Sequence, residues 1–375
     1  MHVIAYTDSA GVGGAEISLS HLVRTASPEI QITVVGVSDE VVNAIAQTST
    51  DQGTTQRFNL SKIVLPATGI HSVWAHLKTF HRLRPDIIHL NLCTPWAGSI
   101  GLFAALTVPQ ARVLRVDQLP LRTTDLLTWL RVRMLSLRLD AHVAVGEASS
   151  RRMEDFYALG RNTVLSIPNG VPDEDLPEVL PLPRQDGWLR VGCVGRLDPM
   201  KGHDVLLKAL AQVDHTHLTI LGEGAFRPQL EQLARDLGIQ DRVKLPGWVE
   251  NPRPYLSTFD VIAQPSRSEG FPLTVVEAML AARPIIATRV GSVAEAISDG
   301  ETGLLIEKDD VAGLAAALKR LQENAALREQ LGQQARAIAS SHFTVTHMTH
   351  QYETLWQTLL NQSRKPRFWV QRPRD

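Results

Sequence analysis

Short runs of apolar and β-branched residues alternate with segments in which apolar residues recur every three or four positions. The short runs predict strands, and the longer periodic segments predict amphipathic helices. In the first half of the chain the predicted helices include Glu16–Arg24 and Leu126–Leu139. The predicted strands there are His2–Thr7, Gln31–Val37, Ile87–Leu90, Arg112–Val116, Ala141–Val145 and Thr163–Ile167. This alternation is typical of an open parallel sheet covered by helices.

The same alternation starts again in the second half, with predicted helices at His203–Leu210 and His347–Leu360. The predicted strands there are Leu189–Val194, Leu218–Leu221, Val243–Leu245, Val261–Gln264, Ile285–Ala287 and Leu304–Ile306. Between the halves, a proline-rich stretch predicts a linker; it comprises Ile167–Pro172, Pro177, Pro181 and Pro183. A chain of 375 residues also exceeds the usual size of one domain. We therefore predict Rossmann-like domains over 1–180 and 181–342, a helix over 343–362 and a tail over 363–375.

Composition favours a globular, intracellular protein. A hydrophobic fraction of 44% is enough for packed cores, and a net charge of −1 gives no general attraction to nucleic acid. Cys93 and Cys193 lie in runs that predict buried strands, so we expect no disulfide and a reducing, cytoplasmic location. The first residues lack the layout of a signal peptide, and the longest apolar candidate, Ala97–Val108, is too short to span a bilayer.

A glycine-rich segment, Gly11–Glu16, follows the first predicted strand and precedes a predicted helix. Glycine lets backbone approach a ligand closely, and the amides of a helix N-terminus bind anions. Gly13 and Gly14 are therefore candidates for phosphate contacts, with a tight turn that binds no ligand as the alternative. The segment lacks the complete G-x-G-x-x-G pattern, which counts against an NAD oxidoreductase.

A second loop, Gly195–Gly202, follows the first predicted strand of the second half and carries two cations, Arg196 and Lys201. Arginine offers forked hydrogen bonds to phosphate and lysine a point charge. The pair could stabilise the negative charge that develops on a departing nucleoside diphosphate. Two solvated loop cations are the alternative interpretation.

Two carboxylates, Glu269 and Glu277, are eight positions apart in the segment Ser268–Met279. Pro272 suits the first turn of a helix, and apolar residues at helical spacing follow it. The amides near the helix start predict a seat for phosphate, and the two carboxylates could hold hydroxyls on either side of a diphosphate. A surface glutamate followed by a glutamate on a helix face is the alternative.

Taken together, these motifs resemble those of retaining GT-B glycosyltransferases of the glycosyltransferase family 4 type. Glu269 and Glu277 resemble the family's Glu-x7-Glu motif, and Gly195–Gly202 resembles its Gly-Arg-Leu-x-x-x-Lys-Gly motif. Smaller segments resemble the loops near the nucleotide base and the closing segment of the family; they are Leu221–Gly224, Pro246–Val249, Ser292–Glu295 and Gly300–Leu305. The motifs occur in the family's order over almost the whole chain.

The resemblance implies an α/β protein with the GT-B fold, in which two Rossmann-like domains with parallel sheets face an interdomain cleft. It implies that the helix over 343–362 returns to the first domain. The implied reaction moves a hexosyl group from a UDP- or GDP-sugar to an acceptor hydroxyl and retains the anomeric configuration. Front-face attack assisted by the donor phosphate needs no protein nucleophile. No Cys/His cluster in the sequence indicates zinc and no Asp-x-Asp is identified as a divalent-metal site, so we expect no metal and no cofactor beyond the nucleotide-sugar co-substrate.

The resemblance also implies roles for individual residues. Arg196 and Lys201 are the implied catalytic cations at the leaving diphosphate, and Glu269 is the implied catalytic residue that positions hydroxyls of the donor sugar. Glu277 is implied to bind ribose. The implied donor-binding residues are Gly13, Gly14, Gly195, Gly222, Gly224, Gly270, Phe271, Pro272, Leu273, Thr274 and Glu277.

The N-terminal half departs from the family pattern. Asn91 stands where a second histidine often follows His89, and Asp117 stands near the place of a histidine that contacts the donor sugar. We take His89, Asn91 and Asp117 as candidate contacts to acceptor or sugar, with a strand-capping role for Asp117 as the alternative. The departure keeps two other functions open: a non-catalytic nucleotide-sugar-binding subunit and a GT-B sugar-nucleotide epimerase.

The expected partners are a nucleotide-sugar donor and a saccharide or lipid-linked saccharide acceptor, in bacterial polysaccharide or glycolipid biosynthesis, with no nucleic acid. The tail over 363–375 has five basic residues, one acidic residue and aromatic side chains, which suits peripheral contact with the inner face of the plasma membrane. A solvated terminus is the alternative. The apolar stripe of Leu126–Leu139 predicts a packed helix, and an interfacial helix that guides a lipid-linked acceptor is the alternative.

Overall fold

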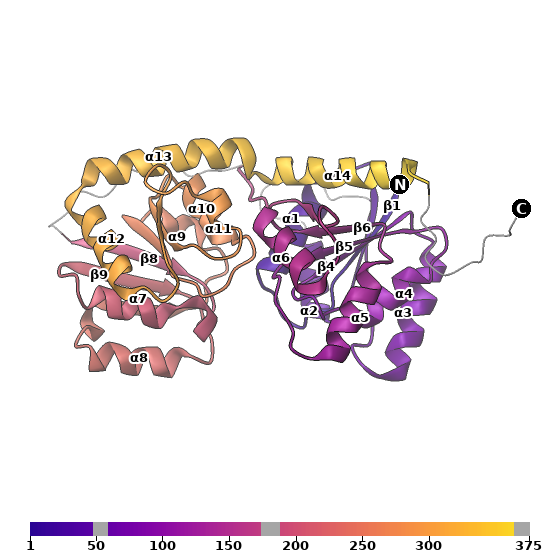
Figure 1. Cartoon of the computed structure of the whole chain (residues 1–375), viewed down its shortest axis with the longest axis horizontal. Helices are drawn as coiled ribbons and strands as arrows, with labels where there is room; N and C mark the ends of the chain where they lie inside the picture. Colours follow the sequence, from indigo (N-terminus) through magenta and orange to yellow (C-terminus); the bar gives the residue numbers. More distant parts are fainter. Residues whose placement is uncertain (48–58, 174–187, 364–375) are drawn as a thin grey trace, which may run out of the picture. The chain divides into compact units, whose positions relative to one another are not determined.

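The computed structural model describes residues 1–47, 59–173 and 188–363 of the chain. The chain forms two compact units, each with its own parallel sheet (Figure 1). The first comprises Met1–Gly170 and the segment from Val345 onward, and the second comprises Val171–Thr344. The described part of the predicted linker ends at residue 173, so Pro177, Pro181 and Pro183 lie outside the described residues, as does the tail from position 364.

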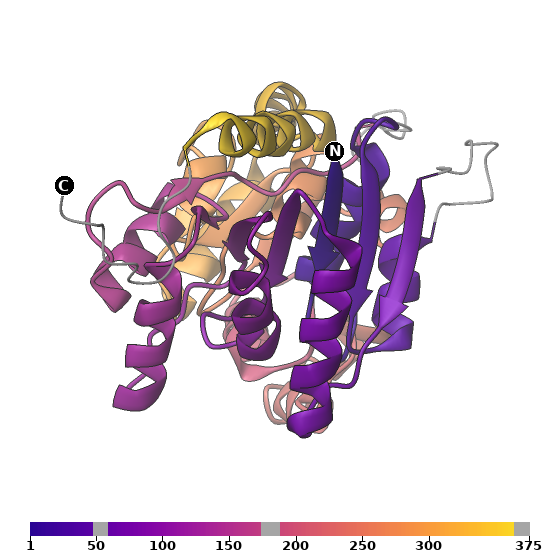
Figure 2. The same cartoon turned by 90° about the vertical axis from the view of Figure 1, so that its right-hand side faces the viewer.

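The first unit contains a seven-stranded sheet in the order β3-β2-β1-β4-β5-β6-β7 (Figure 2). Its strands are β1 His2–Tyr6, β2 Gln31–Gly36, β3 Leu60–Val64, β4 Ile87–Leu92, β5 Arg112–Asp117, β6 Ala141–Ala144 and β7 Leu165–Ser166. Its helices are α1 Gly14–Thr25, α2 Asp39–Ala46, α3 Gly69–Leu83, α4 Ser99–Leu106, α5 Leu126–Ser136, α6 Glu147–Tyr157 and α14 Val345–Asn361. All the strand pairs are parallel. The sheet is therefore doubly wound.

The direction of the crossovers decides which face each helix covers. From β1 to β3 the chain moves toward one edge of the sheet, and from β3 through β4 to β6 it moves back across the sheet toward the other edge. Because such crossovers are right-handed, α1 and α2 cover one face and α3, α4 and α5 cover the other. The strands between them are buried: every residue of β4 and β5 is buried, including the polar His89, Asn91 and Asp117.

The second unit contains a six-stranded parallel sheet in the order β10-β9-β8-β11-β12-β13. Its strands are β8 Leu189–Val194, β9 Thr216–Leu221, β10 Val243–Gly247, β11 Val261–Gln264, β12 Ile285–Thr288 and β13 Leu304–Ile306. Its helices are α7 His203–Leu210, α8 Arg227–Asp236, α9 Arg253–Leu256, α10 Leu273–Leu280, α11 Val293–Ala296, α12 Val311–Glu323 and α13 Ala325–His342. Apolar side chains of β8, β9 and β11 pack with those of α7 and α12 into the core of this unit.

The structure corrects several predictions about local structure. β3 was not predicted because it is an edge strand with mostly exposed side chains, which leave no apolar run in the sequence. Cys93 is exposed, since β4 ends one residue before it, whereas Cys193 is buried in β8, and neither cysteine forms a disulfide. Pro272 precedes α10 as its N-cap, with an extended backbone, and does not lie in the first turn.

The prediction for the Leu126–Leu139 segment was wrong in its packing. The helix α5 ends at Ser136, and the predicted stripe faces solvent: Leu127 is 77% exposed and Leu137 is 55% exposed. The packed side of α5 is carried by Val132 and Ser136. The apolar residues at helical spacing therefore lie on the solvent-facing side of this helix, and not on its packed side.

Candidate functional site

The candidate site of the second unit lies at the carboxyl ends of β8 and β11. These two strands are neighbours in the sheet, but the chain runs from β8 outward to β10 and starts again at β11 on the other side. This reversal of strand order is the point at which ligands bind in open α/β sheets. The segments after β8 and β11 carry the predicted residues Arg196, Lys201 and Glu269.

The structure brings Lys201 and Glu269 together. Lys201 Nζ lies 2.6 Å from Glu269 Oε1, and the two side chains are 20% and 9% exposed. Gln264 Nε2 and Ser266 Oγ donate to the same oxygen at 2.9 and 2.7 Å. Three donors thus fix Oε1, while no hydrogen bond within the described residues reaches Oε2. The carboxylate is held in one orientation with one oxygen available to a ligand.

Two glycines allow the loops around this pair to approach each other. Gly202 has φ +68°, and a Cβ there would lie 2.0 Å from the carbonyl oxygen of Pro265. Gly291 has φ +56°, and a Cβ there would lie 1.9 Å from the carbonyl oxygen of Glu269. Any side chain at either position would push the backbones apart. Close packing of these loops therefore depends on the absence of Cβ.

Arg267 ties the loop after β11 to the loop after β8. Its backbone N–H donates to the Met200 carbonyl at 2.7 Å, and its guanidinium donates twice to Asp204 on α7, both times at 2.8 Å. Burial raises the pKa of the Asp204 carboxyl, but the hydrogen bonds and charge of Arg267 outweigh it and hold that pKa below its usual range. This charged clamp keeps Lys201 beside Glu269.

Arg196 is held through its backbone carbonyl, while its side chain is largely exposed. Its carbonyl accepts a hydrogen bond from His203 Nε2 at 3.1 Å. Its guanidinium is 74% exposed, and its ion pair with Asp198 is 3.3 Å long. The structure therefore leaves Arg196 available to turn toward an anion near the Lys201–Glu269 pair.

The two glycines after β9 are required by close packing between loops. Gly222 has φ +154°, and a Cβ there would lie 2.0 Å from the Gly195 carbonyl oxygen. A Cβ at Gly224 would lie 2.3 Å from the carbonyl oxygen of Leu197. Both positions thus let the loop after β9 pack against the loop that carries Arg196. Gly195 itself lies against the side chain of Lys201 at 3.6 Å, an ordinary contact.

The N-terminus of α10 supplies amide groups close to Glu269 in sequence. The N–H groups of Leu273 and Thr274 have no acceptor in the part of the chain that the structure describes. Gly270 is held by its carbonyl, which accepts from Ser292 N at 2.9 Å, and the ring of Phe271 packs against a neighbouring ring. The positive end of the helix dipole and these two amides form a suitable seat for a phosphate group.

Glu277 is a second available carboxylate, one turn into α10. The residue is partly exposed, and its carboxylate makes no hydrogen bond or ion pair with any described residue. Burial raises the pKa of Glu277 to about 7, although the positive charge of Arg253 lowers it. A ligand whose hydroxyls donate to this carboxyl would favour its ionised form. Of the two predicted carboxylates, Glu269 is therefore held in one orientation, and Glu277 has no partner among the described residues.

Three residues of this cluster were not predicted from the sequence. Gln264 and Ser266 orient Glu269, and Arg267 clamps the two loops. All three stand at or directly after the carboxyl end of β11, a strand that was predicted with its observed bounds. The rule that ligands bind beyond the strand ends at a reversal of strand order could have drawn attention to them.

The predicted residues of the first unit belong to a separate compact part of the chain. Gly13 is the N-cap of α1, with its N–H donating to Glu16 Oε2 at 3.0 Å, and a Cβ at Gly14 would meet open space. Burial holds the pKa of Glu16 above its usual value, although hydrogen bonds to the carboxyl partly offset this effect. The first amides of α1 thus remain a possible anion seat within this unit.

Asn91 belongs to an internal chain of amide hydrogen bonds. Its Nδ2 donates to the Ala15 carbonyl at 2.9 Å, and its Oδ1 accepts from Gln118 Nε2 at 2.8 Å. Gln118 Oε1 in turn accepts from Asn169 Nδ2 at 2.9 Å. Both ends of the Asn91 amide are therefore used to hold the start of α1 against β4, rather than to meet a ligand.

His89 and Asp117 are buried. His89 is 1% exposed between the rings of Tyr352 and Trp356 on α14, and burial lowers the pKa of His89 to about 3. Asp117 is 0% exposed, 2.7 Å from Arg115 Nη2 and 2.5 Å from His142 Nε2. Burial raises the pKa of Asp117, but these two partners hold it below its usual range. The internal contacts of Asn91 and Asp117 explain these two polar residues without a ligand, whereas the buried Nδ1 of His89 has no hydrogen-bond partner among the described residues.

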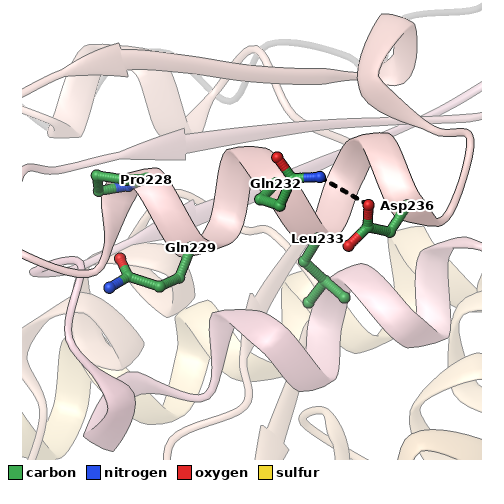
Figure 3. Close-up of a pocket in the computed structure, with 5 residues that line it drawn as sticks. All are labelled: Pro228, Gln229, Gln232, Leu233 and Asp236. Atoms are coloured by element: carbon green, nitrogen blue, oxygen red, sulfur yellow. Dashed lines mark hydrogen bonds between the residues drawn. The ribbon is translucent and has the colours of Figure 1, made fainter.

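One pocket lies away from all of these residues. It runs along α8 and is lined by Pro228, Gln229, Gln232, Leu233 and Asp236 (Figure 3). Gln232 Nε2 donates to Asp236 Oδ1 at 2.7 Å, so the polar groups of this pocket partly satisfy each other. No predicted site residue lines it.

Two features are absent from the described residues. They contain no group of three or more His, Cys, Asp or Glu side chains arranged to hold a metal ion. None of the helices in these same ranges combines the length and apolar character needed to cross a bilayer.

A family match covers most of the second unit. Residues 189–324 match the family Glycosyl transferases group 1. The lipopolysaccharide core biosynthesis glycosyltransferase LpsD of Rhizobium meliloti is 33% identical over 171 residues, 46% of this chain and 50% of that protein. The D-inositol 3-phosphate glycosyltransferase of Stackebrandtia nassauensis is 31% identical over 56% of this chain and 52% of its own length. The chain thus spans about half the length of the curated relatives it matches.

Solved structures show the fold. The Anabaena protein HepE in complex with UDP-glucose has a TM-score of 0.80 and 23% identity, covering 95% of this chain and 100% of that chain. Sucrose-phosphate synthase of Thermosynechococcus elongatus has a TM-score of 0.79 and 20% identity, covering 96% of this chain and 99% of that chain. The predicted α/β, GT-B fold is confirmed.

Proposed function

Because residues 189–324 form a glycosyl transferases group 1 domain in a chain with the GT-B fold, we propose that this protein is a glycosyltransferase. It moves a hexosyl group from a UDP- or GDP-sugar to an acceptor hydroxyl and retains the anomeric configuration. The observation that carries the proposal is the Lys201–Glu269 pair, in which three donors hold Oε1 and Oε2 stays available. HepE, crystallised with UDP-glucose, supports UDP as the first nucleotide to test.

The leaving group meets positive charge on two sides. Arg196, largely exposed, and Lys201, partly exposed, contact the diphosphate, and the amides of Leu273 and Thr274 bind a phosphate oxygen at the start of α10. Lys201 then shares its three N–H donors between Glu269 and the phosphate. These groups stabilise the charge that develops as the bond between the anomeric carbon and the phosphate oxygen breaks. We propose that this arrangement needs no metal ion.

The acceptor attacks the sugar on the same face from which the diphosphate departs. The acceptor oxygen forms its bond to the anomeric carbon, and its proton passes to the departing phosphate oxygen. Glu269 Oε2 accepts a hydrogen bond from a hydroxyl of the donor sugar and holds the ring in position. Glu277, in its ionised form, accepts from the ribose hydroxyls. Glu269 and Glu277 thus act through positioning and binding, with no covalent intermediate.

The proposed acceptor is a saccharide or lipid-linked saccharide in bacterial polysaccharide or glycolipid biosynthesis. Two relatives, LpsD and LpsE of Rhizobium meliloti, are named as lipopolysaccharide core biosynthesis glycosyltransferases, which supports this class. The enzyme would work in the cytoplasm, in peripheral contact with the inner face of the plasma membrane.

A thermal-shift experiment with UDP, GDP, ADP and NAD, in buffer containing EDTA, tests the donor site. A ligand that binds only the folded protein raises its melting temperature. We expect UDP or GDP to stabilise the wild type, and Glu277→Gln to lose most of that shift. Glu329→Gln, an exposed glutamate on α13, is the matched control and should behave as the wild type.

The outcomes separate the alternatives. Release of UDP or GDP from a nucleotide sugar, slow without acceptor and faster with one, supports transfer. Nucleotide binding without any release favours a non-catalytic binding subunit, and interconversion of the donor sugar without release of nucleotide favours an epimerase. Stabilisation by NAD alone, or an equal shift in Glu277→Gln and the wild type, contradicts the proposed site.

A further inference from the structure

Helix α5 in the first unit exposes a line of large apolar side chains. We call this line the α5 crest. It consists of Leu126 at 67% exposure, Leu127 at 77%, Leu130 at 43%, Met134 at 48% and Leu137 at 55%. Most of these residues recur every three or four positions, so they share one side of the helix. A contiguous apolar surface of this kind is uncommon on soluble proteins and indicates an interaction site.

The opposite side of α5 is firmly attached to the unit. Val132 is 2% exposed and packs with Met153 and Tyr157 of α6. Trp129 Nε1 donates to the Phe156 carbonyl at 2.6 Å, and Arg133 Nη1 donates to the Tyr157 carbonyl at 2.8 Å. The crest is therefore exposed because the helix is anchored by its other side, and not because the helix is loosely packed.

Arginines flank the crest. The segment 121–138 contains four arginines and a single acidic residue. The acidic residue is Asp125, which caps the helix by accepting from Thr128 N at 2.7 Å. Arg122 and Arg131 are exposed. Because the whole chain has a net charge of −1, this positive charge is a property of the α5 surface and not of the protein in general.

The same layer of helices exposes further aromatic and apolar side chains. Helices α3, α4 and α5 cover one face of the first sheet, as the direction of the crossovers requires (Figure 1). On α3, Ile70 is 65% exposed and Trp74 is 67% exposed, and on α4, Phe103 is 50% exposed. Apolar exposure is therefore a feature of this helix layer, with α5 as its longest line.

We propose that the α5 crest docks the protein on a bilayer surface rich in anionic lipid. The apolar side chains enter the boundary between headgroups and acyl chains, and the flanking guanidinium groups bind lipid phosphates. The crest side chains are exposed along the outside of a helix that is anchored by its other side, so the contact is made at the bilayer surface. A second copy of this chain fits less well, because a twofold contact between two crests brings arginines toward arginines. The proposal is independent of the site in the second unit.

Sedimentation with vesicles tests the proposal on the full chain. One set of vesicles contains phosphatidylcholine only, and the other contains phosphatidylcholine with phosphatidylglycerol. We expect the wild type to bind the anionic vesicles, and Leu127→Asp/Leu130→Asp to bind them at least about tenfold more weakly, because buried leucine surface is lost. Ile338→Asp on α13, where the isoleucine is 38% exposed, is the matched control and should bind as the wild type.

Two more variants test whether the flanking arginines and the C-terminal tail contribute to vesicle binding. Arg131→Ser should weaken binding to anionic vesicles about fivefold, since one basic residue near such a surface contributes about that factor. A chain that ends at Ser363 removes the basic tail and should still show the effect of the Leu127→Asp/Leu130→Asp change. Three results overturn the proposal: wild-type protein that does not sediment, equal sedimentation of the crest variant, or binding lost only with the tail. Self-association abolished by the crest variant would assign the crest to a second copy.

The vesicle readout is separate from the nucleotide site. The crest residues are exposed, so their substitution should leave the fold and the UDP- or GDP-induced thermal shift unchanged. A crest variant that binds nucleotide normally and has lost lipid binding supports the proposal even if no transfer reaction is ever found. Loss of both properties would indicate misfolding, which circular dichroism of the variant detects, and the Arg131→Ser variant then decides the question.

Discussion

Both units reverse their strand order at the middle of the sheet, β1 beside β4 in the first and β8 beside β11 in the second, yet they treat the polar groups there differently. In the first unit, Asn91 uses both ends of its amide internally, and Asp117 on the next strand is completely buried with Arg115 and His142. In the second unit, Arg196 is 74% exposed. The same topology therefore places a buried charged network, Arg115–Asp117–His142, in the first unit and a solvent-exposed charge, Arg196, in the second. We call the buried group the sealed network.

The difference lies in whether the charged groups are buried against an oppositely charged partner or left accessible. Charged groups that are buried and paired stabilise a fold and have little left to offer a ligand. At β11, three donors converge on one oxygen of Glu269 and leave the other, and Glu277 has no partner among the described residues. The comparison predicts that changes in the first cluster reduce stability, whereas changes in the second reduce binding and turnover.

The largest effect is expected from Asp117→Asn. Arg115 is 1% exposed, so removing the negative charge leaves a buried cation without compensation. We expect the free energy of unfolding to fall by about 3–5 kcal/mol. Urea denaturation of the wild type and the variant measures the change. If the variant is as stable as the wild type, the Arg115–Asp117–His142 cluster does not have the stabilising role that distinguishes the first unit.

A loss of turnover is expected from Arg196→Ala. The side chain is largely exposed, so its removal should change stability little, but the departing diphosphate loses one stabilising cation. We expect kcat to fall about 10²–10³-fold. Release of nucleoside diphosphate from the donor identified by thermal shift measures the change. Arg235→Ala on α8, also exposed, is the control, and equal turnover in the two variants would remove Arg196 from the leaving-group site.

A pH dependence of nucleotide affinity is expected from Glu277. Its pKa is raised to about 7, and ribose hydroxyls donate to the ionised form. Affinity should therefore be constant well above pH 7 and fall by up to about tenfold for each pH unit below it. Titration calorimetry between pH 5.5 and 8.5 follows this change. Glu277→Gln should bind more weakly at high pH and retain only the dependence that comes from the phosphates of the nucleotide, and a wild-type curve of the same shape would contradict the assignment.

Glu277 also links pH to the stability of the free protein. The folded protein holds this proton more tightly than the unfolded chain, whose glutamate pKa is near 4.5. The contribution of the group is fully present below pH 4.5 and is lost as the pH rises through about 7. Over that interval the free energy of unfolding should fall relative to Glu277→Gln by up to about 1.4 kcal/mol per pH unit, which urea denaturation of the two proteins at several pH values measures.

The smallest effect is expected from Asp155→Asn. Its ion pair with Arg161 is 2.9 Å long, but the two side chains are 56% and 66% exposed. Water screens the pair, so we expect a change of less than about 0.5 kcal/mol in the free energy of unfolding. The same urea experiment applies. A loss similar to that of Asp117→Asn would mean that burial is not what separates the sealed network from ordinary surface pairs.

Much of the fold could be predicted from local patterns. Each predicted strand was observed with ends within two residues, and α7 was observed at the predicted His203–Leu210. These elements have buried apolar runs or a clear helical period. The prediction missed β3, whose side chains are mostly exposed at the sheet edge, and it mistook the exposed side of α5 for its packed side. An amphipathic pattern tells which residues share a face, but not whether protein, water or lipid covers that face.

The sequence by itself determined the two series of alternating strands and helices, the loops Gly195–Gly202 and Ser268–Met279, and the charges that they carry. These properties depend on residues close together in the chain. Only the tertiary structure decided that Lys201 meets Glu269, 68 positions away, and that Gln264 and Ser266 orient the same carboxylate. It alone decided that Asp117 is buried and Arg196 exposed, because burial and pairing depend on what distant segments place around a side chain.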